Sequence, residues 1–308
     1  MEQPSKKNLA NGVYAALATP RRKGSAEPDT AGILDYVDAV AQAGVDGVLL
    51  FGSTGEFVHF DIADRIHNLN LAIRRSRVPV LVNVSHSTLD GAAVLADDAV
   101  ERGAAGLLLM PPYFFQYSEA DIEQFYLRFA DTVEGRLPIY LYNIPTVTNR
   151  MSAALALRLL ATGLFAGIKD SSGEWEMFDA LNRERNNRAF QIFIGNEIIY
   201  VRARYAGSSG TISGVTAALP ELVVSLDRAI RADKKDSVEK LNKRLMEFLN
   251  PIQKFPATVA IKQAAVARGW ALDHFAVPPG EVNRAELDRY RDWLKDWIPA
   301  VLKECALA

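Results

Sequence analysis

The chain has 308 residues, of which 49% are hydrophobic and 23% charged, so it can bury the core of one large α/β barrel or of two ordinary domains. Its formal net charge of −2 gives no electrostatic case for binding nucleic acid or an anionic membrane surface. The single cysteine, Cys305, excludes an internal disulfide, and no segment has the pattern of a signal peptide or a bilayer span, which together predict a soluble, cytoplasmic protein.

Eight short runs of nearly continuous apolar residues recur along the chain. Runs that are apolar on both faces are typical of parallel strands that are covered on both sides. The eight runs begin at Gly12, Gly47, Pro79, Gly106, Pro138, Phe165, Phe190 and Gly210. We therefore predict eight parallel strands.

The segments between these runs have helical periodicity. In the segment after Thr30, one apolar stripe consists of Ile33, Tyr36, Val37 and Val40. Ser118 and Asp121 have the spacing of an N-terminal cap, and the stripe of the helix that follows consists of Ile122, Phe125, Tyr126 and Phe129. Each predicted strand is thus followed by a predicted helix.

Three joins between a helix and the next strand share one glycine pattern. They are AGVDG from Ala43, RGAAG from Arg102 and AGSSG from Ala206. The first glycine of each suits the left-handed conformation that ends many helices, and the second suits the entry to a strand.

Eight strand–helix units predict an α/β fold, a (β/α)8 TIM barrel, which typically takes roughly 250 residues. Beyond Asp233 the pattern becomes wholly helical. We therefore expect a catalytic barrel over residues 9–233 and a C-terminal helical extension over residues 234–308. A doubly wound open sheet is the competing fold, but no Gly-x-Gly-x-x-Gly motif follows the first strand.

Catalytic groups of such barrels lie at the carboxyl ends of the strands and in the loops that follow them. The polar residues predicted to lie there are Ser53, Thr54, His86, Tyr113, Tyr142, Lys169, Asn196, Glu197, Ser213 and Thr216. The four histidines lack a metal-ligand spacing, and we expect neither a metal nor a cofactor at this end of the barrel.

Lys169 ends the sixth apolar run and is the only lysine between Gly24 and Asp233. Burial at a strand end disfavours the charged ammonium form, and a neutral amine is a nucleophile toward carbonyls, as Schiff-base catalysis requires. Side chains alternate along a strand, so the neighbouring Asp170 should point away from Lys169. A surface ion pair is the alternative role for a lysine in this place.

A Schiff-base enzyme also needs a proton donor and a site for the substrate's carboxylate. Tyr142 on the adjacent strand is the candidate acid or base, although a packed core tyrosine would fit the same pattern. In GSTGE, the backbone N–H groups and the hydroxyls of Ser53 and Thr54 make a small anion site, or simply a turn.

Together, GSTGE, YNIP and GIKDSSG, with GNE and GTISG downstream, resemble the dihydrodipicolinate synthase / N-acetylneuraminate lyase family over nearly the whole chain. The resemblance implies that Lys169 forms a Schiff base with pyruvate or with the 2-keto end of a sugar acid, and that Tyr142 moves protons. It also implies a homotetramer, a dimer of dimers. The substrate-binding residues that it implies are Ser53, Thr54, Ile212, Gly195, Glu197 and Ser171.

Three departures from the family pattern bear on the substrate. Val147 stands where the lysine-pathway synthases carry a carboxylate-binding arginine, and Phe114 stands where they use a proton-relaying tyrosine. Ile198 stands where the sialate lyases have a second acidic residue beside Glu197. We therefore expect a Schiff-base lyase that cleaves or forms a 2-keto-3-deoxy acid or another 4-hydroxy-2-oxo acid, with pyruvate and an aldehyde as the small-molecule partners. A synthase-type condensation, a dehydration of a keto-deoxy sugar acid, and a non-catalytic barrel that binds a keto acid stay open.

Overall fold

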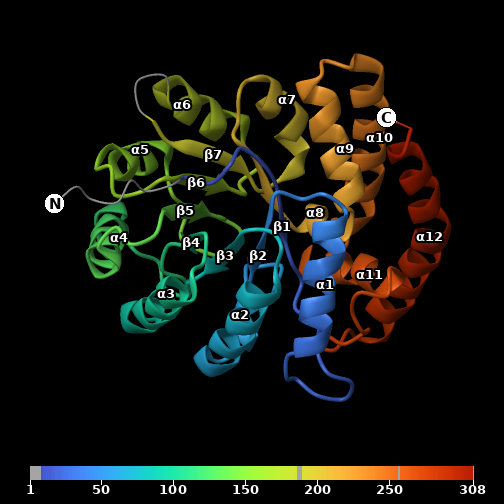
Figure 1. Ribbon diagram of the computed structural model, residues 1–308, viewed down its shortest axis with the longest axis horizontal. Helices are drawn as coiled ribbons and strands as arrows, with labels where there is room; N and C mark the ends of the chain where they lie inside the picture. Colours follow the sequence, from blue (N-terminus) through green and yellow to red (C-terminus); the bar gives the residue numbers. More distant parts are fainter. Residues whose placement is uncertain (1–7, 186–188, 256, 308) are drawn as a thin grey trace. The chain divides into compact units, whose positions relative to one another are not determined.

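The computed structural model describes residues 8–185, 189–255 and 257–307 (Figure 1). Its strands form one closed parallel barrel in the order β1 to β8. They are β1 Gly12–Ala16, β2 Gly47–Leu50, β3 Val80–Asn83, β4 Gly106–Leu109, β5 Ile139–Asn143, β6 Gly167–Asp170, β7 Gln191–Ile194 and β8 Gly210–Ser213. Each lies within one of the eight apolar runs, so the predicted strands and the TIM-barrel fold are confirmed.

Helices follow the strands along the chain. They are α1 Thr30–Gln42, η1 Phe57–His59, α2 Ile62–Arg75, α3 Leu89–Arg102, α4 Glu119–Val133, α5 Ala153–Ala161, α6 Trp175–Arg185, η2 Glu197–Ile199, α7 Tyr200–Tyr205, α8 Gly214–Ala218, α9 Pro220–Arg231, α10 Lys235–Ile252, α11 Ala257–Ala267 and α12 Glu281–Cys305, where η marks a 3-10 helix. None of those in the described ranges combines the length and the apolarity needed to cross a membrane.

The predicted caps and stripes account for where individual helices begin and which face they bury. The four apolar residues predicted for α1 are its buried residues, and Asp29 caps its N-terminus by accepting from the Gly32 N–H. Ser118 and Asp121 form a capping box at the start of α4. The stripe of α4 differs from the prediction, because Phe125 is half-buried and Ala130 and Val133 are buried in addition.

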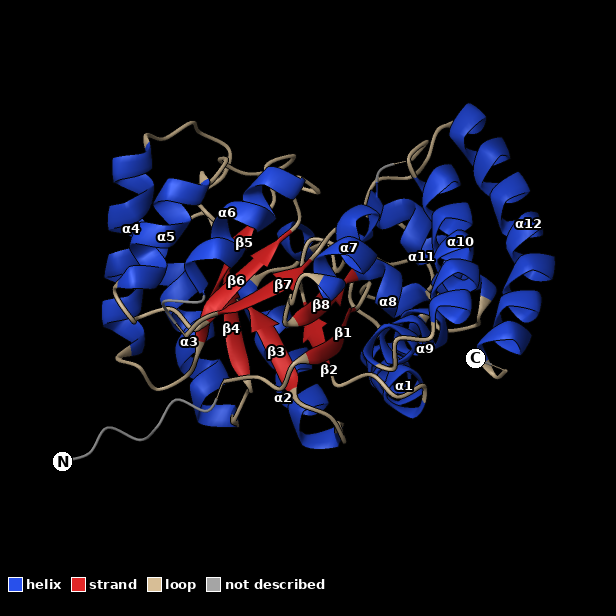
Figure 2. Cartoon of the chain, turned by 90° about the horizontal axis from the view of Figure 1, so that it is seen from above, coloured by secondary structure: helices blue, strands red, loops and turns tan. Residues whose placement is uncertain are grey.

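Two compact units make up the chain. The first consists of residues 1–11 and 79–211, with β3 to β7 and the start of β8, and the second consists of residues 12–78 and 212–308. In the first unit, helices α3 to α6 lie side by side in chain order (Figures 1 and 2). Beyond Asp233, where the sequence predicts a wholly helical pattern, the second unit has the helices α10 to α12. The domain boundary near residue 233 stays a prediction.

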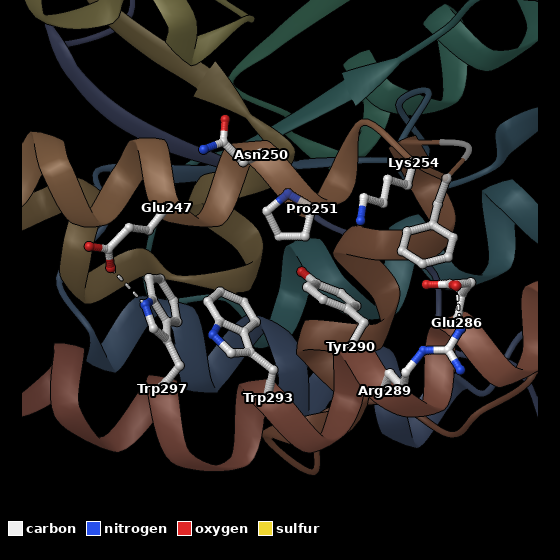
Figure 3. Close-up of a pocket in the computed structure, with 10 residues that line it drawn as sticks. Glu247, Asn250, Pro251, Lys254, Glu286, Arg289, Tyr290, Trp293 and Trp297 are labelled. Atoms are coloured by element: carbon white, nitrogen blue, oxygen red, sulfur yellow. Dashed lines mark hydrogen bonds and ion pairs between the residues drawn. The ribbon is translucent and has the colours of Figure 1, made fainter.

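The aromatic residues of the tail pack against one another within the second unit. Trp293 and Trp297 of α12 stack with ring centres 4.7 Å apart, and Tyr290 stacks on Trp293 at 5.8 Å. These rings line a cavity of about 550 Å³ between α10 and α12 (Figure 3). None of the predicted site residues lines this cavity, so it is separate from the candidate active site.

Candidate active site

Strand pairing in the first unit sets the positions of Lys169 and Tyr142. Strands β5 and β6 run parallel, with Tyr142 opposite Lys169 and Asn143 opposite Asp170. Side chains of directly paired residues share one face of a sheet, and successive residues alternate between faces. Lys169 and Tyr142 therefore share one face, and Asp170 and Asn143 share the other.

The amine of Lys169 lies against the Tyr142 ring. Its Nζ is 4.0 Å from the ring centre, and both side chains are buried, with 3% of Lys169 and 1% of Tyr142 exposed. A cation over an aromatic face is electrostatically favourable, and the ring also shields the amine from water. The structure thus brings together the two residues predicted to be catalytic.

Asp170 is held on the opposite face by its own partners. Its carboxylate accepts a hydrogen bond of 2.6 Å from the Asn143 side chain and one of 2.7 Å from the Ser172 hydroxyl. Burial raises the pKa of this carboxyl, and the hydrogen bonds from Ser172 and Asn143 oppose that shift. Asp170 therefore points away from Lys169, as the strand alternation predicted.

Gly195, directly after β7, makes room for Lys169. A Cβ at this position would lie 2.9 Å from Cε of Lys169 and would collide with the Ser171 hydroxyl. The Gly195 N–H donates to the Asp170 carbonyl at 2.7 Å, so its backbone is fixed beside β6. Gly195 and Ser171, both predicted to bind substrate, thus lie next to the lysine.

Glu197 begins the short helix η2 and is buried, whereas the neighbouring Ile198 is 57% exposed. Asn196 caps this helix, because its side chain accepts from the Ile198 N–H at 3.3 Å. Asn196, predicted to lie at the strand end, therefore has a local structural role as well.

The loop between β4 and α4 presents aromatic side chains to solvent. Phe114 is 88% exposed and has a left-handed backbone with φ of 79°. Asn149, from the loop after β5, fixes this loop by donating to the carbonyls of Pro112 (2.6 Å) and Phe115 (2.7 Å) and accepting from the Tyr117 N–H (2.9 Å). Asn149 was missed in the sequence analysis, because its partners lie 32 to 37 positions away in the chain and no pattern near Asn149 indicates them.

The predicted carboxylate site lies in the second unit. Residues 52–55 form a turn after β2, and Ser53 and Thr54 are both half-buried there. The turn is closed by the Glu56 N–H donating to the Ser53 carbonyl at 3.0 Å, and Thr19 donates its hydroxyl to the Gly55 carbonyl at 2.7 Å. The short helix η1 follows the turn, and α2 begins only after it.

Glu56, the last residue of GSTGE, has buried cationic partners that the sequence analysis missed. Its carboxylate lies 3.2 Å from Nζ of Lys262 in α11 and 3.7 Å from Nε of Arg21. In the sequence, only the presence of an acidic residue at Glu56 could have suggested these cations, since a buried carboxylate requires a paired cation.

The end of β8 is also in the second unit. Ile212 is fully buried in the strand. A Cβ at Gly214 would lie 2.7 Å from the Thr54 hydroxyl, so this glycine permits close packing of β8's end against the turn. Ser213 caps the N-terminus of α8 by accepting from the Thr216 N–H at 3.1 Å, and the hydroxyls of the two residues lie 2.9 Å apart.

The histidines have local partners or are exposed. His86 accepts the Thr88 N–H at 3.1 Å in the turn before α3, and His274 accepts the Gly24 N–H at 2.6 Å. His59 and His67 are exposed. In the ranges that the structure describes, no group of three or more His, Cys, Asp or Glu side chains is arranged to hold a metal ion.

Comparison with known proteins identifies the family. The sequence model of the dihydrodipicolinate synthetase family matches residues 9–296. The chain belongs to this family. Its members include lyases and synthases, so the protein is an enzyme of the aldolase and lyase type. The family resemblance seen in the sequence motifs is thereby confirmed.

Named relatives within the family differ in activity. A 4-hydroxy-tetrahydrodipicolinate synthase of Salinibacter ruber is 31% identical over 281 residues, 88% of this chain and 89% of that protein. An uncharacterized DapA-like lyase of Chloroflexus aurantiacus is 28% identical, over 81% and 85% of the two chains. A probable 2-dehydro-3-deoxy-D-pentonate aldolase, YjhH of Escherichia coli, is also 28% identical, over 82% and 85%.

A solved family structure has the same fold. YagE, a prophage protein of Escherichia coli K12 solved in complex with pyruvate, superposes with a TM-score of 0.86 at 24% identity. The match covers 94% of this chain and 99% of YagE. This likeness supports the barrel and its helical tail as one family architecture.

Proposed function

We propose that this enzyme is a Schiff-base lyase that cleaves or forms a 2-keto-3-deoxy acid or another 4-hydroxy-2-oxo acid, with pyruvate and an aldehyde as its partners. The observation that carries the proposal is the buried amine of Lys169, 4.0 Å from the centre of the Tyr142 ring. The proposal requires neither a cofactor nor a metal. It includes the homotetramer that the family resemblance implies and the cytoplasmic location predicted from the composition.

The chemistry begins at the Lys169 amine. The amine adds to the keto carbon of the substrate and water leaves, which forms an imine. The protonated imine accepts the electron pair when the carbon–carbon bond breaks, so that an aldehyde departs and an enamine remains. Protonation of the enamine carbon and hydrolysis of the imine then release pyruvate and restore the lysine.

Tyr142 is the group that accepts or donates protons in this cycle. The aldehyde can leave only if the hydroxyl on the cleaved carbon loses its proton, and a side chain positioned beside the imine is suited to take it. Tyr142 is proposed as the side chain beside the imine because it is paired with Lys169 across β5 and β6. The reverse reaction needs the same group to return the proton.

The substrate's carboxylate is proposed to bind the turn at residues 52–55. Ser53 and Thr54 offer hydroxyl donors after β2, and the backbone at Ile212 lies near the carboxyl end of β8. Gly195, Ser171 and Glu197 are proposed to contact the rest of the keto acid. Glu197, as a buried carboxylate, is suited to accept a hydrogen bond from a substrate hydroxyl.

Two side chains favour cleavage of a keto-deoxy acid over the lysine-pathway condensation. Val147 is 61% exposed and cannot bind the carboxylate of an aldehyde substrate, and the exposed Phe114 has no hydroxyl to relay a proton. The condensation would need a carboxylate-binding arginine in place of Val147 and a tyrosine hydroxyl in place of Phe114. Cleavage of a substrate already joined to Lys169 needs neither group.

Borohydride reduction in the presence of pyruvate, followed by peptide mass spectrometry, tests the proposal. We expect a reduced pyruvyl adduct on the Lys169 peptide. Lys262 is an internal control, because it is an equally buried lysine outside the proposed site and should stay unmodified. Absence of any adduct from mildly acidic to basic pH would contradict the proposal and favour a barrel that only binds keto acids.

A substrate screen separates cleavage from the alternative reactions. Incubation with 2-keto-3-deoxy acids should release pyruvate and an aldehyde, which a coupled reduction of pyruvate detects. Formation of a dehydrated keto acid without pyruvate would assign a dehydratase instead. The Lys169→Ala protein should be inactive in both assays.

A further inference from the structure

A buried charge cluster joins the C-terminal helices to the turn at residues 52–55. Nζ of Lys262, in α11, lies 3.2 Å from a carboxylate oxygen of Glu56, and Nε of Arg21 lies 3.7 Å from the same oxygen. The side chains of Lys262 and Arg21 are each 1% exposed and that of Glu56 is 9% exposed. All three belong to the second unit.

The backbone on either side of this turn is strained. Phe51 and Glu56, the residues before and after it, are left-handed, with φ of 53° and 54°. A residue with a side chain rarely adopts this conformation, and it persists only where surrounding contacts enforce it. At Glu56 the side chain pairs with Lys262, and the Thr19 hydroxyl donates to the adjacent Gly55 carbonyl.

Helix α11 and Thr54 both border Gly214. A Cβ added at Gly214 would lie 2.6 Å from Cδ1 of Ile261 and 2.7 Å from the Thr54 hydroxyl. Ile261 precedes Lys262 in α11, so consecutive residues of one helix reach the packing of Thr54 and the charge of Glu56. Helix α11 thus pairs with Glu56 and borders the same glycine as Thr54.

We infer that Lys262 is a positioning residue for the keto acid's carboxylate, acting through Glu56 to hold Ser53 and Thr54 in their binding geometry. This inference rests on the proposed function, in which those two residues bind the carboxylate. It assigns the C-terminal helices an indirect part in substrate affinity. Two cations and one carboxylate make up the cluster, so replacing Lys262 by a neutral residue still leaves Arg21 to balance Glu56.

Lys262→Met and Lys262→Gln, with the dissociation constant for pyruvate measured by calorimetry, test the inference. We expect the dissociation constant to rise about tenfold or more in both, the scale of a lost charged hydrogen bond. Lys262→Arg, which keeps the charge, should bind within about threefold of the wild type. Maximal turnover should change less than affinity, because Lys169 and Tyr142 are untouched.

Arg268→Met is the matched control. Arg268 follows α11 and makes a two-bond ion pair with Glu221 of α9, at 2.6 and 2.7 Å, and it also donates to the Ala218 carbonyl at 3.2 Å. This variant should lower the melting temperature and leave pyruvate affinity unchanged. Wild-type affinity in both Lys262→Met and Lys262→Gln, or an equal loss in Arg268→Met, would overturn the inference.

The borohydride and calorimetry experiments distinguish a failure of the proposed function from a failure of the inference about Lys262. The borohydride adduct on wild-type Lys169 reports the Schiff base, whereas calorimetry reports binding whether or not a covalent bond forms. Wild-type protein that binds pyruvate without an adduct would overturn the proposed function alone. Wild-type protein that binds no pyruvate at all would overturn both.

Discussion

A side chain at Gly195 would take the space that Lys169 occupies. The Cβ would lie 2.9 Å from Cε of the lysine, and it would collide with the Ser171 hydroxyl on the same side. The path of the Lys169 side chain toward Tyr142 therefore depends on the absence of a side chain at the end of the neighbouring strand β7.

Gly195→Ala should impair the lysine without removing it. Displacement of a reacting group by about an ångström costs on the order of 100-fold in rate, and overpacking costs about 1–3 kcal/mol of stability. We expect the rate of borohydride trapping with pyruvate to fall about 100-fold. Gly280→Ala is the control, because Gly280 has ordinary φ of −64° and a Cβ added there would meet no atom within 4 Å. Equal trapping rates in the two variants would disprove the steric role of Gly195.

Tyr142→Phe should remove proton transfer and keep the packing. General acid–base groups contribute about 100- to 10,000-fold, so turnover should fall by that order. Tyr140→Phe is a control on the same strand and face. The Tyr140 hydroxyl accepts the Leu9 N–H at 3.1 Å and donates to Gln191 at 2.6 Å, so its loss should cost about 1–3 kcal/mol of stability and leave turnover intact.

Steady-state kinetics and urea unfolding of both tyrosine variants give the comparison. A Tyr142→Phe enzyme with wild-type turnover would mean that another group moves the proton. A Tyr140→Phe enzyme with the larger loss of turnover would reverse the assignment of the two tyrosines.

The fold could be read from the sequence because its signals are local. Each strand is a short apolar run, each helix has a stripe, and helix ends have recognisable caps, as at Ser118 and Asp121. The pairing of Tyr142 with Lys169 followed in turn from the order of the strands, since consecutive strands of such a barrel are neighbours.

The residues that support the site could not be found in the same way. Lys262 lies 206 positions from Glu56 in the chain, and nothing near either residue indicates the other. The left-handed backbone of Phe51, Glu56 and Phe114 runs against the preference of residues with side chains, so only the surrounding contacts explain it. Long-range contacts of this kind are specified by the folded structure and leave no periodic pattern.

Asn149→Ala should loosen the loop that carries Phe114 and Phe115. The buried amide makes three hydrogen bonds to the backbone of residues 112–117, and its loss leaves those groups without a partner. We expect a loss of about 2–4 kcal/mol in stability. Amide exchange at Tyr117 should accelerate, because its N–H donates to the lost oxygen.

Asn149→Asp separates the hydrogen bond that Asn149 accepts from the two that it donates. It keeps the acceptor for the Tyr117 N–H and removes both donors, so Tyr117 should stay protected while the carbonyls of Pro112 and Phe115 lose their partner. Unchanged exchange in the alanine variant would show that other contacts hold this loop.

The pH dependence of stability should reveal the buried Asp170 carboxyl. Burial raises its pKa above the ordinary value of 3.8, so the folded state holds the proton more tightly than the unfolded state does. The free energy of unfolding therefore loses this contribution as the pH rises from about 4 through the folded-state pKa, and the loss is complete above it.

Asp170→Asn removes this titration and can keep the hydrogen bonds. Its carbonyl can accept from Asn143, as one Asp170 oxygen does, and its amide can donate to the Ser172 hydroxyl. Urea unfolding across this pH range should show the variant gaining stability relative to the wild type as the pH rises. Asp131→Asn, at an exposed position of α4, measures the ordinary effect of removing a carboxylate. If both variants follow the same pH profile, the carboxyl of Asp170 is as well solvated by its neighbours as by water, and burial does not govern its charge.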